Sequence, residues 1–104
     1  MTLANLLRAV RNLLQNRGRA RGHWTDDEDR LCLAAAMALV GDASSDDRNA
    51  VAQAKLAMVS ALVPYLPDGY GGILNRFNDD PATTDQHVFN LIDKALAELG
   101  ALTR

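Results

Sequence analysis

Two long stretches of the chain carry apolar residues at the spacing of an α-helix. One stripe runs through residues 3–16 and the other through residues 84–99. Residues three, four and seven apart share one face of a helix, so both stretches predict amphipathic helices with one buried face. The first stripe consists of Leu3, Leu6, Leu7, Val10, Leu13 and Leu14. The second consists of Val88, Leu91, Ile92, Ala95, Leu96 and Leu99.

Local signals predict where these two helices begin and end. Thr2 is suited to cap the first helix, and Gly18 is suited to stop it. Thr83 with Gln86 fits the capping-box pattern for the last helix, in which each side chain bonds the other residue's backbone. We expect Gly100 to end that helix, because glycine readily takes the left-handed conformation that follows many helices.

Two further helices are expected between these stripes. Residues 30–40 are apolar on every side after an arginine and are rich in alanine, which is typical of a buried central helix. We expect Asp29 to cap this helix and Gly41 to end it. Residues 46–62 predict the other helix, with Ser45 as its cap. Its expected inner face consists of Val51, Ala54, Met58, Ala61 and Leu62.

The pattern as a whole predicts an all-α fold. We expect a single domain over residues 1–104, with four main helices around one core and room for a fifth, short helix at 73–77. No segment has the alternation of a convincing strand. A chain of 104 residues buries about 65% of its extended surface on folding, which is enough for one modest core.

The cysteine count and the longest apolar run narrow the class of protein. One cysteine cannot form an internal disulfide or supply a multi-cysteine zinc site. The longest apolar run spans residues 31–40, whereas a membrane-spanning helix needs about twenty residues. We therefore expect a cytoplasmic protein that crosses no membrane and carries neither a metal nor a cofactor.

Charge is unevenly distributed along the chain. The formal net charge is −2, but residues 1–22 contain five arginines and no acidic residue. We call this cluster the arginine edge; it consists of Arg8, Arg11, Arg17, Arg19 and Arg21. Together with His23 and Trp24 of the following loop it predicts a surface that binds a partner protein, since tryptophan and arginine are frequent anchors of interfaces.

Two other interpretations of this segment stay open. Trp24 could instead fix the long loop onto the helices, which is a purely structural role. The arginines could contact the phosphates of a nucleic acid. The second interpretation is not favoured, because aromatic residues make up only 5% of the chain and no nucleic-acid-binding motif accompanies the arginines.

Cys32 offers a different class of function. A thiol in the first turn of a helix is made more reactive by the free backbone N–H groups there. A cysteine-dependent enzyme would need His87 or His23 as its base, with Asn78 or Asp79 to orient that base. The alternative is a buried, inert cysteine, with Asn78 and Asp79 serving only to form a turn.

The segment Phe77-Asn78-Asp79-Asp80-Pro81-Ala82-Thr83-Thr84 and the apolar helix after it resemble an uncharacterised family. This is a domain-of-unknown-function family of small proteins from actinobacteria and their phages. The likeness extends over about residues 5–97 and includes Cys32 at the opening of a small-residue helix. The family usually has a glycine where this chain has Ala35, and His23 separates Gly22 from Trp24. The resemblance implies a fold and an origin but no reaction.

These observations favour one function over the others. The leading hypothesis is a small non-enzymatic protein-interaction module, encoded by a phage or prophage, that modulates a host protein. Its partner would be that host protein or a second copy of itself. The cysteine-dependent enzyme and the nucleic-acid-binding protein remain the alternatives.

Overall fold

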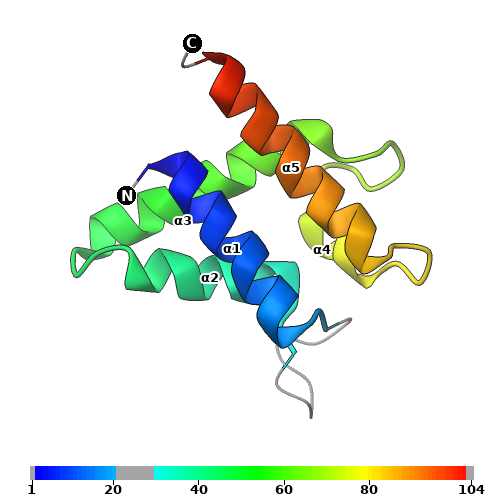
Figure 1. Ribbon diagram of the computed structural model, residues 1–104, viewed down its shortest axis with the longest axis horizontal. Coiled ribbons are helices and arrows are strands. Elements are labelled where there is room, and N and C mark those ends of the chain that lie inside the picture. Colours follow the sequence, from blue (N-terminus) through cyan, green and yellow to red (C-terminus); the bar gives the residue numbers. More distant parts are fainter. Residues whose placement is uncertain (1, 21–29, 103–104) are drawn as a thin grey trace.

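The computed structural model describes residues 2–20 and 30–102, with side chains described up to residue 100. The described residues form five α-helices and one 3-10 turn (Figure 1). The all-α prediction is confirmed, including the short additional helix. Within the described residues the only β feature is an isolated bridge between Arg19 and Leu31. The helical elements are α1 (Leu3–Arg17), α2 (Leu33–Ala43), α3 (Arg48–Leu62), η1 (Val63–Tyr65), α4 (Leu74–Asp79) and α5 (Asp85–Leu102).

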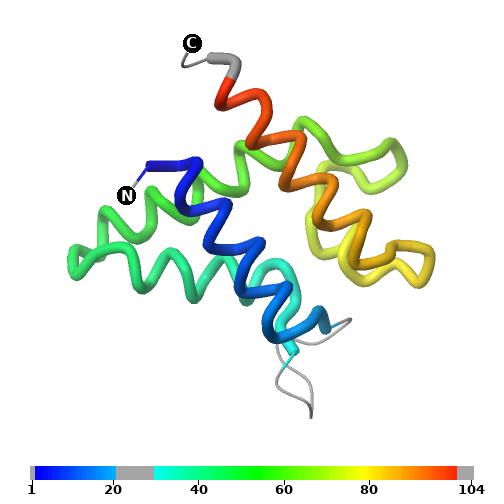
Figure 2. The backbone as a smooth tube through the Cα atoms, viewed as in Figure 1, coloured from blue at the N-terminus to red at the C-terminus, as the bar shows by residue number. Residues whose placement is uncertain are grey.

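The helices form two antiparallel pairs that cross each other (Figures 1 and 2). α2 and α3 form one hairpin, joined by a short turn, and α1 crosses this hairpin and packs on both of its helices. α5 lies beside α1 and runs in the opposite direction. The short α4 packs against α2 close to the start of α5. This arrangement brings the starts of α2 and α5 together with the end of α4.

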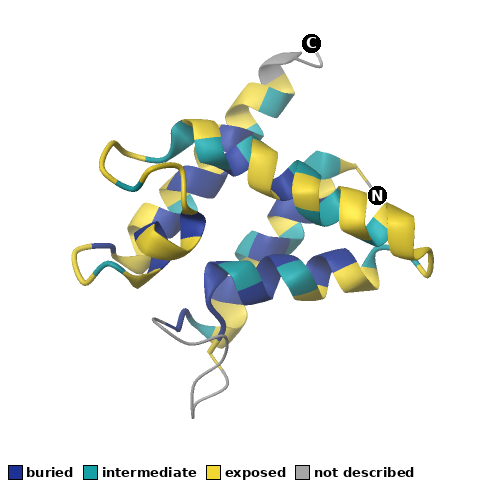
Figure 3. Ribbon diagram, turned by 180° about the vertical axis from the view of Figure 1, so that it is seen from behind, coloured by how far each residue is buried: buried dark blue, intermediate teal, exposed yellow. Residues whose placement is uncertain are grey.

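The core is built from the predicted apolar stripes. α1 contributes Leu6, Leu7, Val10 and Leu14, and α5 contributes Val88, Leu91, Ile92 and Ala95. α2 is buried on most of its circumference, as expected for the central helix (Figure 3). α3 differs from the others, because only Met58 and Leu62 of its fifteen residues are buried. The rest of α3 therefore lies near the surface.

Two of the predicted helix starts are displaced by a few residues. α2 begins after Cys32 rather than after Asp29, and the Cys32 sulfur accepts the Ala35 N–H at 3.3 Å. α3 is capped by Asp47 rather than by Ser45, and the Asp47 carboxylate accepts the Asn49 N–H at 2.9 Å. Ser45 accepts the Asp47 N–H instead, so serine and aspartate form consecutive turns before the helix.

The capping box of α5 is also displaced, by one residue. Thr84 Oγ1 accepts the His87 N–H at 3.2 Å, and His87 Nδ1 accepts the Thr84 N–H at 3.0 Å. The predicted pair of Thr83 and Gln86 is therefore wrong. Thr83 is buried and its carbonyl oxygen accepts a hydrogen bond from Arg19, so it belongs to the interior rather than to the cap.

Glycine marks a helix end at only one of the three predicted positions. Gly18 ends α1 with a φ of 83°, and its N–H donates to the Leu14 carbonyl at 2.8 Å. Gly41 instead lies inside α2, where a Cβ atom would meet Lys55 Cγ at 2.7 Å. Because Gly41 has no side chain, α3 can approach α2 closely at this position. Gly100 also lies inside its helix, because α5 continues to Leu102.

Candidate functional site

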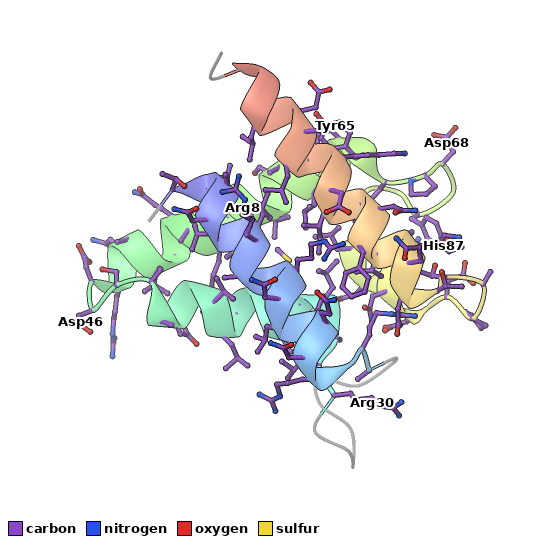
Figure 4. All side chains as sticks on the ribbon, in the orientation of Figure 1. Arg8, Arg30, Asp46, Tyr65, Asp68 and His87 are labelled. Carbon is purple, nitrogen blue, oxygen red and sulfur yellow. The ribbon has the colours of Figure 1, made fainter. Side chains whose placement is uncertain are left out.

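The arginine edge is less exposed than the sequence predicts. Arg8 and Arg17 lie on the surface of α1, and Arg8 donates to Asn5 Oδ1 at 3.1 Å (Figure 4). Arg11 is engaged within the fold, because its Nε lies 2.9 Å from Asp93 Oδ1 and its guanidinium lies 4.9 Å from the centre of the Phe89 ring. Both contacts attach α1 to α5. The predicted contact residues Arg21, His23 and Trp24 lie outside the described residues.

Arg19 is buried, so the prediction that it lies on an exposed surface is wrong. Its side chain is 2% exposed. The guanidinium donates to Asp85 Oδ1 at 2.9 Å, to the Thr83 carbonyl at 2.7 Å and to the Asn78 carbonyl. The physical reason is the chain direction after Gly18, where the bridge to Leu31 turns Arg19 inward. Arg19 therefore connects the end of α1 to α4 and to the start of α5.

Asn78 is the second polar residue of the interior, with an exposed fraction of 0%. Its Oδ1 accepts the Leu33 N–H at 3.2 Å, and its Nδ2 donates to the Ala20 carbonyl at 2.9 Å and to Asp79 Oδ1 at 2.9 Å. One amide thus satisfies the backbone of two other segments. Arg19 and Asn78 together form what we call the buried polar network.

The structure does not join Cys32 with His87, and the other proposed base, His23, lies outside the described residues. Cys32 is buried at the start of α2, and Asn78 accepts the N–H of the residue that follows it, Leu33. His87 is exposed at the start of α5, where its Nδ1 is engaged in the capping box. Cys32 does not line the pocket that His87 lines. Within the described part of the chain, Cys32 and Asn78 lie near each other, whereas His87 belongs to a different site.

An apolar groove lies between α2, α3 and the start of α4. Its volume is about 520 Å³. Ala34 and Ala38 border it on α2, Lys55 and Val59 on α3, and Ile73 on the segment before α4. Val59 is 38% exposed and Ile73 is 44% exposed, so two large apolar side chains of the groove face solvent. We call this feature the α2–α3–α4 groove.

An aromatic pocket of about 310 Å³ lies on another face, between α5 and the segment from Tyr65 to Tyr70. Figure 4 shows Tyr65 and His87 on this side of the molecule. The Tyr70 hydroxyl donates to Asp80 Oδ2 at 2.6 Å. This bond to a carboxylate raises the pKa of Tyr70 above its ordinary value, and a hydrogen bond to Thr83 opposes part of that rise. The phenol therefore keeps its proton at neutral pH, and alkaline pH breaks the bond by ionising the phenol.

Neither a membrane-spanning helix nor a metal-binding cluster occurs in the described residues. No helix among residues 2–20 and 30–102 combines the length and the apolar character needed to cross a bilayer. The same residues hold no group of three histidine, cysteine or acidic side chains that could bind a metal ion.

These features define a class of protein: a small all-α domain that is tied together by buried polar side chains and carries an apolar groove on its surface. The chain belongs to the family described as Family of unknown function (DUF6197), and the family model matches residues 1–98. The resemblance to an uncharacterised domain family is thereby confirmed over nearly the whole sequence. No curated protein and no solved structure matches the chain.

Proposed function

We propose that this protein is a small, non-enzymatic module that binds a partner protein through the α2–α3–α4 groove. The observation that carries the proposal is the exposure of large apolar side chains in and beside the groove. Val59 lines the groove from α3 and is 38% exposed, and Ile73 lines it from the segment before α4 and is 44% exposed. Leu56, three residues before Val59 on α3, is 66% exposed. Contiguous exposed apolar surface on a small domain is typical of an interaction site.

The outward face of α3 indicates what kind of structure occupies the groove. Ala52, Leu56 and Val59 are separated by four and three residues, so they share one face of the helix. This is the a/d spacing by which one helix packs against another. Across the groove, Ala34 and Ala38 present small side chains that let a second backbone approach closely. The occupant that fits is a helix of the partner, laid along α3.

The positive charges at the margins of the groove add a second requirement for the partner helix. Lys55 borders the groove on α3, with its Nζ 2.7 Å from Asp42 Oδ1. Arg76 lies on the exposed side of α4 and forms no ion pair with any described residue. The Arg76 guanidinium lies close to Gly71, since a Cβ atom on that glycine would be 4.0 Å from Arg76 Nη1. The next residue, Gly72, lines the groove, so the charge of Arg76 lies near the groove margin. We therefore propose an amphipathic partner helix whose apolar face is flanked by acidic residues.

The setting of this binding is part of the same proposal. The chain would act in the cytoplasm as a phage- or prophage-encoded module of actinobacterial origin that modulates a host protein. The alternatives lack a specific supporting observation. Cysteine chemistry would need a base at Cys32, and the described contacts place His87 in a different pocket. Nucleic-acid binding would need the arginine edge, of which Arg19 is buried and Arg11 is paired with Asp93.

The proposal predicts that one substitution in the groove abolishes partner capture. Val59→Glu places a charge among apolar side chains, so we expect a loss of at least 10-fold in the captured partner, which corresponds to about 1.4 kcal/mol. The measurement is quantitative capture from the host cell with tagged wild-type and variant protein. Gln53→Glu is the matched control, because Gln53 is exposed on the same helix and does not line the groove.

Three outcomes of this experiment are decisive. Proteins lost with Val59→Glu and retained with Gln53→Glu support the proposal if their binding segment is an amphipathic helix. Equal capture by all three proteins contradicts it. Sedimentation equilibrium of the purified chain tests self-association, and a dimer that Val59→Glu dissociates would replace the proposed partner helix with a second copy of this chain.

A further inference from the structure

The aromatic pocket has walls that are fixed in place. The rings of Tyr70 and Phe77 meet edge to face, with centroids 5.4 Å apart and an interplanar angle of 83°. Phe77 is buried, and the Tyr70 hydroxyl is held by Asp80. Leu91 adds an apolar surface from α5. The aromatic walls are therefore already in position for a flat ring. Binding would immobilise the ligand but would cost little additional conformational entropy in the protein.

The α5 side of the pocket offers hydrogen-bond donors. His87, Asn90 and Lys94 line the pocket from one face of α5, since they are three and four residues apart. His87 Nδ1 accepts the Thr84 N–H, so the proton of the neutral imidazole is on Nε2, which is then a donor. Asn90 Oδ1 accepts from Gln86 Nε2, which leaves the Asn90 NH₂ group to donate.

Lys94 supplies a positive charge to the same side of the pocket. It forms no ion pair with any described residue, and no acidic residue is among those lining the pocket. A ligand that matches these groups must carry acceptor oxygens and a negative charge. A carboxylate meets both requirements.

The volume sets the size of the ligand. A cavity of about 150 Å³ holds one benzene ring, so about 310 Å³ accommodates a single ring with a short acidic substituent. We propose that the aromatic pocket binds a small aromatic carboxylate, with the ring against Tyr70 and Phe77 and the carboxylate at Lys94. A ligand of about ten non-hydrogen atoms in an open pocket of this kind binds with a Kd on the order of 1 mM. This site is independent of the α2–α3–α4 groove.

The test is a titration followed by two-dimensional ¹H–¹⁵N NMR of the whole chain. Phenylacetate is expected to shift the amide signals of Tyr70, Phe77 and residues 87–94, and the shifts should saturate. Phenylacetamide lacks the charge and acetate lacks the ring, so each should bind at least 10-fold more weakly. Lys94→Met should weaken phenylacetate binding about 10-fold. Lys55→Met is the matched control, because Lys55 is the only other lysine of the sequence and does not line this pocket.

The titrations distinguish recognition of the carboxylate from unspecific binding of an aromatic ring. Shifts that fail to saturate below about 10 mM, equal binding of phenylacetamide, or unchanged binding to Lys94→Met would each overturn the proposal. Asn90→Ala provides a second variant, with an expected weakening of about 3-fold, in case Lys94→Met does not fold.

The same carboxylate could come from a free acid or from an aromatic C-terminal residue of a peptide. An acetylated tripeptide that ends in phenylalanine distinguishes these sources. Weaker binding than phenylacetate indicates a free acid, and tighter binding indicates the C-terminus of a peptide.

Discussion

Replacing Arg19 with alanine is expected to lower the free energy of unfolding by about 3 kcal/mol. Most of this cost comes from the backbone carbonyls of Asn78 and Thr83, which are buried and lose their donors. The ion pair with Asp85 contributes little, because the Asp85 side chain is 62% exposed and is screened by water. For a domain of this size the midpoint of thermal unfolding should fall by about 15 °C. Circular dichroism at 222 nm measures this change.

Arg8→Ala is the matched control for this prediction. Arg8 is an exposed arginine of α1, and its hydrogen-bond partner Asn5 lies one turn earlier on the same helix. Its removal should change the unfolding free energy by no more than about 0.5 kcal/mol. Equal melting temperatures for the two variants would show that Arg19 contributes no more to stability than an arginine on the surface.

Asn78→Ala is expected to cost about as much, roughly 3 kcal/mol. The substitution leaves the Leu33 N–H and the Ala20 carbonyl buried without their partner, and it opens a small cavity beneath α4. Urea unfolding gives the free energy directly, and the slope of the transition should stay unchanged because the same surface is exposed.

Asn75→Ala is the corresponding control, because Asn75 is an exposed asparagine of the same short helix. We expect a change within about 0.5 kcal/mol for this variant. A loss for Asn78→Ala no larger than that of its control would contradict the role of Asn78 in joining α4 to the start of α2. Both predictions concern stability, and neither depends on the proposed function.

The helices could be predicted from the sequence because their pattern is local. The stripes that include Leu7 and Ile92 repeat at helical spacing, and both residues are fully buried in the structure. The uniformly apolar segment after Arg30 predicts the central helix for the same reason. Cap positions are harder to predict, because Ser45 and Thr83 have neighbours that can also accept the first backbone N–H groups.

The buried polar network could not be predicted in the same way. Arg19 lies in a run of arginines that resembles a solvated patch, and its burial depends on two backbone carbonyls that are 59 and 64 positions away in the sequence. Asn78 stands in a segment that predicts a turn, and its bonds to Leu33 and Ala20 are equally long-range. Periodicity carries no information about contacts of this kind.

The α2–α3–α4 groove could have been predicted from apolar residues of α3 that lie outside its expected inner face. Leu56 and Val59 lie off that inner face and, with Ala52, repeat at heptad spacing. A helix with apolar residues on two faces is either buried or docked on its second side. In the structure Leu56 is 66% exposed, so the described residues leave most of this side chain uncovered. The surface of interest therefore moves from the arginine edge to α3.

The most direct test of the proposed binding surface is site-specific photo-crosslinking in the host cell. One protein carries a photoreactive amino acid in place of Leu56, beside the groove, and a second carries it in place of Arg8, on the arginine edge. Both positions are exposed, so the reactive group is accessible to a partner at either one. We expect a crosslinked partner protein from position 56 and none from position 8. A partner crosslinked from position 8 and not from position 56 would contradict binding through the groove.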